Sequence, residues 1–360
     1  MAMRFLLLRR RVPSRGSLRD LGPRRLEEHE MNDVARQYPK TVRERNRWIV
    51  AQREERNPVE SRRPYAFLVE KERGERGSLV DVVTLFLTNK ECPWRCFMCD
   101  LWKNTLEFSV PPGAIPQQID HAFEELSIPS RPEDRSSLQL KLYNSGSFFD
   151  PKAIPATDYE AIAERTRGFD RLIVESHPRL VGDRCLSWGR RVDLSLEVAI
   201  GLETVHGDAL AQLNKGFTLE EFRRAASRLR DAGISLRVFL LVNPPFVKPS
   251  EQTEWALRTV AEARRAGATA ICLIPTRQNS GALGALTRAG SFAPTSLKQL
   301  EDVFDLSLDG SYGRVFADLW DLQDFSRCAL CFERRRARLE RMNAEQVILP
   351  RIECENCNGA

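Results

Sequence analysis

The sequence lacks any apolar run that approaches the roughly 20 residues needed to span a bilayer. Its first apolar stretch, residues 5–8, is too short for the core of a signal peptide, and arginines follow it directly. A strong net charge is also missing, because 55 basic against 50 acidic side chains leave only +5. This mild excess permits a nucleic-acid partner without arguing strongly for one. We therefore expect a cytoplasmic protein with no membrane partner.

The sequence lacks the cysteine pattern of a disulfide-rich secreted protein. Its nine cysteines are spread over 360 residues as one triplet, two C-x2-C pairs and two single residues. Metal ligands cluster in this way in proteins of a reducing cytoplasm. The cysteines are therefore expected to bind metal, apart from the two single ones.

The first 78 residues are rich in arginine and glutamate, with sparse apolar spacing. We expect a surface helix over residues 41–52 and a mobile or loosely docked arm elsewhere. The first 18 residues fit an organellar transit peptide or, as we expect, a basic extension from a start codon upstream of Met31. We divide the chain into this extension (1–78), a core (79–280) and a C-terminal region (281–360).

The core alternates strand-like and helix-like segments. Strands are predicted at residues 80–87, 138–143, 171–175, 193–199, 236–242 and 269–274. Amphipathic helices are predicted between them at residues 116–125, 156–167, 219–231 and 252–265. Thr218 and Glu221 form a capping box for the third helix, and Gly233 ends it. The alternation predicts an α/β fold with a parallel sheet of six units, fewer than the eight of a complete barrel.

Polar motifs follow the end of each predicted strand. Because the carboxyl ends of barrel strands share one rim, these motifs should converge in space. They are the cysteines of residues 92–99, then residues 144–147, 175–178, 201–204, 243–246 and 275–277.

Cys92, Cys96 and Cys99 have the spacing C-x3-C-x2-C directly after the first predicted strand. Three thiolates can hold a 4Fe–4S cluster and leave one iron open, whereas four would close it. A zinc knuckle or unrelated thiols are the alternatives. The pattern and its position resemble the radical S-adenosylmethionine (SAM) superfamily, in which SAM chelates the open iron. Met98 stands where many members have an aromatic residue, and its thioether can pack on an adenine face.

The resemblance implies SAM contacts along the rim. The turn that receives the methionine amino group is expected at Asn144, Ser145, Gly146 and Ser147, with an ordinary β-to-α turn as the alternative. Glu197 or Glu203 is expected to accept from the ribose hydroxyls, with a surface salt bridge as the alternative for each. Asn243 could hold SAM or substrate, or could simply form a turn before two prolines.

Glu175 and His177 are the candidate catalytic residues. A carboxylate at the end of an apolar strand is costly unless it has a function or a partner. His177 could donate or shuttle protons, and a structural histidine beside Pro178 is the alternative. Cys185 and Cys272 are expected to be packing residues, although Cys185 could also serve as a hydrogen-atom donor.

The C-terminal region carries a second cysteine set with the spacing C-x2-C-x22-C-x2-C. Its members are Cys328, Cys331, Cys354 and Cys357. Structural zinc, an auxiliary iron–sulfur cluster and no shared metal all remain open. Five arginines lie between the two pairs, and they would either grip phosphates or form a solvated helix face. They are Arg334, Arg335, Arg336, Arg338 and Arg341.

Longer motifs narrow the resemblance. Residues 142–151, 174–178, 199–204, 213–218 and 240–246 are similar to radical SAM proteins related to the Elongator catalytic subunit, and most to the archaeosine synthase radical-SAM subunit. The resemblance implies a partial (β/α)6 barrel, a SAM-binding 4Fe–4S cluster and reductive cleavage of SAM to a 5′-deoxyadenosyl radical. It also implies an external one-electron donor of the flavodoxin or ferredoxin class and, more weakly, a modified transfer RNA (tRNA) base as substrate.

Two functions are compatible with these features. The first is a radical SAM enzyme that abstracts hydrogen from its substrate. The second is a metal-stapled RNA-binding protein without catalysis, which would use the C-terminal cysteines and the arginine helix.

Overall fold

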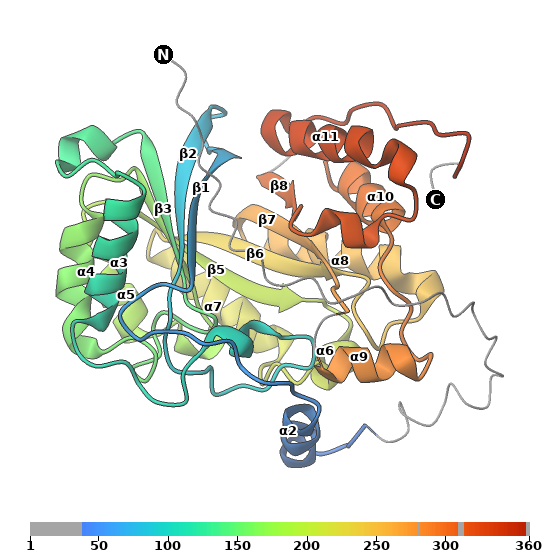
Figure 1. Cartoon of the computed structure of the whole chain (residues 1–360), viewed down its shortest axis with the longest axis horizontal. Coiled ribbons are helices and arrows are strands. Elements are labelled where there is room, and N and C mark those ends of the chain that lie inside the picture. The colour runs from blue at the N-terminus through green and yellow to red at the C-terminus, as the bar shows by residue number, and fades with distance from the viewer. Residues whose placement is uncertain (1–37, 279–280, 309–312, 358–360) are drawn as a thin grey trace.

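The computed structural model describes residues 38–278, 281–308 and 313–357, and the basic segment predicted at residues 1–37 lies outside them. The described chain forms one sheet of eight strands in the order β1 to β8, curled into an open half-barrel (Figure 1). The first pair, β1 and β2, is antiparallel, and all later pairs are parallel. The strands are β1 (Ala66–Arg73), β2 (Leu79–Phe86), β3 (Leu138–Tyr143), β4 (Arg171–Glu175), β5 (Ser195–Glu203), β6 (Ser235–Val242), β7 (Ala268–Pro275) and β8 (Arg314–Ala317).

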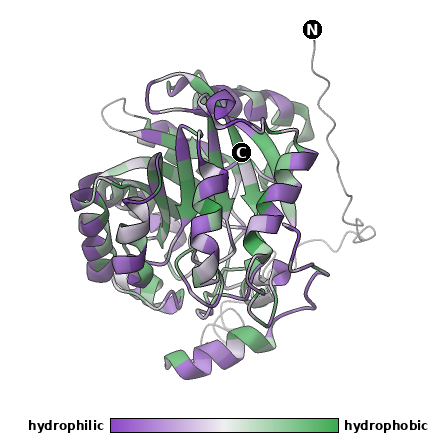
Figure 2. Cartoon of the chain, turned by 90° about the vertical axis from the view of Figure 1, so that its left-hand side faces the viewer, coloured by the Kyte–Doolittle hydropathy of each residue, from purple (hydrophilic) through white to green (hydrophobic). Residues whose placement is uncertain are grey.

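Helices cover the convex face of the sheet, and their outward surfaces are hydrophilic while the strands between them are apolar (Figure 2). None of the helices in the described ranges is both long and apolar enough to cross a membrane. The α-helices are α2 (Val42–Ala51), α3 (Ala114–Glu125), α4 (Tyr159–Thr166), α5 (Asp183–Gly189), α6 (Gly207–Gln212), α7 (Leu219–Asp231), α8 (Gln252–Arg265), α9 (Gly281–Arg288), α10 (Leu297–Ser307) and α11 (Ala329–Glu345).

The structure confirms the predicted α/β fold with an open barrel. Strands β2 to β7 correspond to the six predicted strands, and α7 and α8 have the predicted bounds. The capping box of Thr218 and Glu221 is present, and Gly233 follows α7 with a φ of 70°. Each of these strands is buried along most of its length, as expected of parallel strands in an α/β protein.

Two strands lie outside the predicted core of residues 79–280. Strand β1 comes from the predicted extension. Its second half is charged, because side chains such as Glu72 pair with charged side chains of other strands, and it therefore lacks the apolar residues that would predict a strand. Strand β8 comes from the predicted C-terminal region and is only four residues long. The sheet therefore extends across both predicted domain boundaries.

Charged residues fill the inner face of the sheet near the amino ends of the parallel strands. Glu197 has no exposed surface, and its carboxylate accepts from Arg237 (2.5 Å), Arg171 (3.3 Å) and Arg314 (3.2 Å). Glu72 of β1 in turn accepts from Arg237 and, at 2.6 Å, from Lys141. Buried charges are tolerated only when they are paired and hydrogen-bonded. The members of this network therefore depend on one another, and together they fill one end of the half-barrel.

Replacing Glu197 by alanine should strongly destabilise the protein. The change leaves three buried arginines without their shared carboxylate, and breaking a buried ion pair typically costs about 3–5 kcal/mol. The free energy of unfolding in urea measures the loss.

The control is Glu340→Ala, which removes the nearer of two carboxylate partners of Arg336 (2.9 Å), where the side chains of Arg336 and Glu340 are both 48% exposed. An exposed pair contributes little, so this variant should lose less than about 1 kcal/mol. Equal losses in the two variants would contradict the importance of the buried network.

Candidate functional site

The cysteine loop, residues 92–99, lies at the carboxyl end of β2 and is held by the loop after α6. The Phe97 amide donates to the Leu213 carbonyl at 2.9 Å. The side-chain amide of Asn214, a residue with a φ of 56°, donates to the Arg95 carbonyl at 2.7 Å. These bonds fix the middle of the cysteine loop against a segment more than a hundred residues away in sequence.

Gly216 and His177 complete this support through Trp94. Gly216 has a φ of +75°, and a Cβ there would lie 2.4 Å from the Trp94 ring. A face of the Trp94 ring stacks on His177, with ring centroids 3.5 Å apart and an interplanar angle of 7°. The indole thus fills the space between two loops, and only glycine fits at position 216.

The segment 38–56 clamps the cysteine loop from its other side. Glu91, directly before Cys92, forms salt bridges with Arg53 (2.7 Å), Arg56 (2.5 Å) and Arg95 (3.0 Å). The predicted helix is present as α2, which adds Trp48 in a stacked contact with Phe97. The arm expected to dock loosely is therefore packed on the loop over these residues, because its charged side chains find buried partners.

The three cysteines of the loop are partly exposed, although protein atoms surround most of each sulfur. Burial raises the pKa of Cys92 to about 12, and it raises the pKa values of Cys96 and Cys99 as well. The ammonium group of Lys215 acts in the opposite direction on Cys96. Thiolates form readily here only if further positive charge is added, as a bound metal centre would do.

The turn after β3 brings unsatisfied polar groups beside these thiols. Asn144 is fully buried, and neither its amide nitrogen nor its amide oxygen has a hydrogen-bond partner in the described structure. A Cβ on Gly146 would lie 3.3 Å from the Cys92 Cβ. Ser145 contacts the Tyr65 hydroxyl at 3.1 Å, and Ser147 contacts Ser176 at 3.2 Å. A buried side-chain amide without a hydrogen-bond partner is rare. The turn therefore fits a polar ligand that binds next to the cysteine loop.

Glu175 faces this turn, and burial raises its pKa to about 7 against the opposing effect of the backbone N–H groups of Gly146 and Asn144. The carboxyl group is thus divided between its neutral and ionised forms near neutral pH. His177 differs, because its Nε2 bonds to the Lys215 carbonyl (2.9 Å) and its Nδ1 accepts from the Arg179 amide (3.2 Å). Because both ring nitrogens are engaged, the structure favours a structural histidine over a proton shuttle. His177 is a positioning residue.

The two candidate ribose ligands lie at opposite ends of β5. Glu197 is in the buried ion network and is not brought together with the rim residues. Glu203 is at the rim with a φ of 65°, and it accepts from Lys215 at 2.7 Å. Gly201 leaves room for this pair, because a Cβ there would lie 2.4 Å from the Glu203 carboxylate. Lys215 was missed as a site residue, although a lysine in a turn beside glycine could have suggested it.

Two further predicted residues have structural partners. Asn243 has a φ of 60°, and its amide nitrogen donates to the Ala293 carbonyl (2.9 Å) and to Thr295 (3.3 Å), which fits the turn-forming alternative. Met98 packs against the apolar cluster that contains Phe97 and Tyr38.

Aromatic rings line the inner face of the sheet between the ion network and the rim. Phe86 lies 6.1 Å from Tyr143 and 5.8 Å from Trp320, and Tyr143 lies 6.0 Å from Phe239, measured between ring centroids. Trp320 is 51% exposed. Such rings can make stacked or edge-to-face contacts with a planar group.

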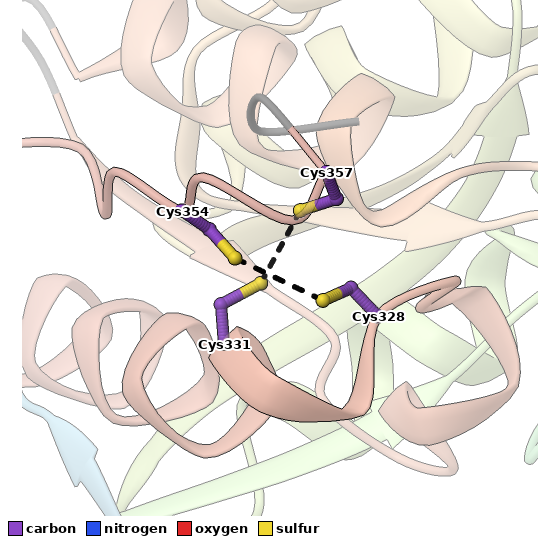
Figure 3. A group of neighbouring side chains, drawn as sticks. All are labelled: Cys328, Cys331, Cys354 and Cys357. Atoms are coloured by element: carbon purple, nitrogen blue, oxygen red, sulfur yellow. Dashed lines mark hydrogen bonds between the residues drawn. The ribbon is translucent and has the colours of Figure 1, made fainter.

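The four C-terminal cysteines form a separate group (Figure 3). Their sulfurs all lie within 4.8 Å of one another. Cys328 and Cys331 belong to the start of α11, whereas the cysteine loop packs on α2, and Figure 1 shows α2 and α11 at opposite ends of the molecule. The two cysteine sets therefore serve different sites.

Four of the five arginines of α11 pair with carboxylates, and the fifth, Arg334, donates to the Glu353 carbonyl at 3.4 Å. Arg335 pairs with Glu301 (2.7 Å) and Arg338 with Asp305 (2.7 Å), both on α10, and these two arginines are buried. On the exposed face, Arg336 pairs with Glu340 and Arg341 pairs with Glu345. This arrangement favours an internally neutralised helix over one that grips phosphates, and it removes support from the RNA-binding alternative.

No family model matches the chain. The β subunit of archaeosine synthase from Thermococcus kodakarensis is 28% identical over 175 residues, 47% of this chain and 52% of that subunit. The corresponding subunit from Methanosarcina acetivorans is 23% identical over 63% of this chain and 67% of its own. An uncharacterised protein of Methanocaldococcus jannaschii is 22% identical over 70% of both chains.

Solved structures with a similar fold include Elp3 from Methanocaldococcus infernus, with a TM-score of 0.46, 16% identity and coverage of 67% of this chain and 60% of Elp3. Streptococcus suis SuiB bound to SAM has a TM-score of 0.47, 10% identity and coverage of 64% and 49%. The predicted resemblance to a subunit of archaeosine synthase is confirmed. The match spans about half of the Thermococcus subunit.

Replacing Gly216 by alanine should disturb the cysteine loop, because the new methyl group collides with Trp94 at a positive φ. Overpacking of this kind costs about 1–3 kcal/mol, and we expect less iron per chain after anaerobic reconstitution. The control is Gly207→Ala, where nothing lies within 4 Å of the added Cβ. Equal iron content in both variants would contradict the supporting role of Gly216.

His177 should stay neutral well below its ordinary range, since burial lowers its pKa to about 3. The unfolded chain binds a proton at about pH 6.5, so this residue makes stability fall as pH decreases between those two values. His177→Gln should reduce the pH dependence of unfolding there. Histidine NMR of the native protein checks the protonation state directly, and a midpoint between about pH 6 and 7 would restore His177 as a proton shuttle.

Proposed function

We propose that the protein is a radical SAM enzyme whose site lies at the carboxyl rim of the half-barrel. The observation that carries the proposal is the orphan amide of Asn144 beside a clamped loop with three thiols. Cys92, Cys96 and Cys99 would hold the 4Fe–4S cluster. When bound there, the cluster and SAM supply reductive cleavage to a 5′-deoxyadenosyl radical that abstracts hydrogen from the substrate.

The rim residues have distinct tasks in this proposal. Asn144 and the turn at Gly146, with Glu175 behind them, bind the ammonium group of the methionine moiety. Glu203 accepts from the ribose hydroxyls, and Lys215 balances its charge while favouring the thiolate of Cys96. Within the loop, Trp94 stacks on His177 and Phe97 stacks on Trp48. These rings would keep water away from the reacting groups.

We infer that the substrate is a planar base of tRNA. The aromatic rings of Phe86, Tyr143, Phe239 and Trp320 support a flat group on the inner face, since stacking on such rings is sequence-tolerant and strong. The similarity to archaeosine synthase β subunits supports tRNA as its carrier. A second subunit would then provide most of the RNA-binding surface.

The reaction also needs an electron, which we assign to an external donor of the flavodoxin or ferredoxin class. A reducing cytoplasm is the matching compartment, because all nine cysteines are free thiols in the structure.

After anaerobic reconstitution with iron and sulfide, the protein should convert SAM to 5′-deoxyadenosine when dithionite is added. Cys96→Ala should lower both cluster content and product at least about 100-fold, since the loss of one of three ligands leaves the cluster unsupported. Chromatography of 5′-deoxyadenosine and iron analysis measure the two effects.

Cys185→Ala, which changes a buried thiol in the apolar core, is the matched control and should keep the cluster. A cluster-loaded protein that never cleaves SAM would refute the proposal. Adding tRNA tests the substrate separately: a rise in 5′-deoxyadenosine only with tRNA that carries the modified base supports the assignment, and no response to any tRNA overturns it.

A further inference from the structure

The half-barrel has an open side between its edge strands, β1 and β8, and α11 packs against both of them. Asn343 and Gln346, at the end of α11, occupy the free edge of β8. Asn343 accepts from the Ala317 amide at 2.8 Å and donates to the Ala317 carbonyl at 2.9 Å. Gln346 makes the same two bonds with Val315, each at 2.8 Å. Two side-chain amides thus replace a ninth strand.

The other side of the gap is linked through β1. Arg73 donates to the Ala344 carbonyl of α11 at 3.2 Å, and Arg314 of β8 donates to the Arg73 carbonyl at 3.1 Å. Helix α11 therefore connects the two edges that the sheet leaves unpaired.

Apolar burial secures the segment after α11 only in part. Leu349 packs against the core, whereas Val347 is 47% exposed and Ile348 is 54% exposed. Polar contacts tie the segment as well, because Arg338 donates to the Leu349 carbonyl (2.7 Å) and Arg351 pairs with Asp302 of α10 (2.6 Å). A further covalent or metal link would secure it.

The four cysteine sulfurs have the spacing of ligands to one ion. The Cys328 and Cys354 sulfurs are 3.9 Å apart, and the Cys331 and Cys357 sulfurs are 3.7 Å apart (Figure 3). Zinc with Zn–S bonds of about 2.3 Å places tetrahedral sulfurs about 3.8 Å apart. A 4Fe–4S cluster binds each thiolate through a different iron at the corners of a cubane, which requires a wider set.

The surroundings suit a closed, negatively charged thiolate site. Asn356 donates an amide N–H to the Cys328 sulfur at 3.6 Å, as groups around structural metal sites commonly do. Cys328 and Cys331 stand at the amino-terminal turn of a 17-residue helix, whose dipole favours negative charge.

We propose that these four cysteines bind a single Zn²⁺ ion, and that this ion secures α11 across the open side of the half-barrel. The ion joins the first turn of α11 to residues 354–357. The helix and the segment that follows it are thereby held together against α10. The site is independent of the SAM chemistry proposed above, and its role is structural.

Metal analysis of the full-length protein tests the ion. The variant Cys92→Ala/Cys96→Ala/Cys99→Ala should lose its iron and acid-labile sulfide and still carry about one zinc per chain, as a closed tetrahedral site requires. Cys354→Ser/Cys357→Ser should lose the zinc and keep the iron. Iron with sulfide in the first variant, or unchanged zinc in the second, would overturn the proposal.

Hydrogen exchange tests the structural role without relying on a variant that fails to fold. Removing zinc from the folded protein with a chelator should speed exchange of the Val315 and Ala317 amides by at least about tenfold, because local opening of α11 exposes them. Asn343→Ala/Gln346→Ala is the matched variant: it should show the fast exchange with zinc still bound. Unchanged exchange after complete zinc removal would refute the role of the ion.

Discussion

The buried carboxylate of Glu197 is the contact on which the half-barrel depends. It is shared by arginines from β4, β6 and β8, and Glu72 extends the network to β1 and β3. Such a network is costly unless every member is paired, so it is a specific lock between strands far apart in sequence. It occupies one end of the inner face and leaves the opposite, carboxyl end to the cysteine loop.

The cysteine loop is ordered by two distant segments rather than by its own sequence. The loop at Leu213 to Gly216 supports it by hydrogen bonds and by the fit of Trp94, and the segment with Arg53 and Arg56 neutralises Glu91. Pre-organisation of this kind lets three thiols meet a cofactor without rearrangement of the backbone. The second cysteine set lies at the opposite end of the molecule, where we propose that it stabilises the fold through α11.

Apolar periodicity made much of the fold predictable. Strands β2 to β7 and helices α7 and α8 carry clear patterns, and the rim motifs follow directly from the parallel topology. Strand β1 was missed because its inward residues, such as Glu70 and Glu72, are charged and pair only with side chains of other strands. For the same reason Arg53 and Arg56, which lie in the segment expected to be a mobile or loosely docked arm, are packed on the cysteine loop.

The sequence by itself determined the α/β class, the triplet at the end of the first core strand and the division of the cysteines into two sets, because spacing and periodicity are local properties. Tertiary structure alone decided that Glu203 rather than Glu197 reaches the rim, that both nitrogens of His177 are engaged, and that Lys215 stands beside the thiols. Each of these depends on which partner the folded chain places within hydrogen-bonding distance, and a carboxylate or an imidazole carries no local sign of that partner.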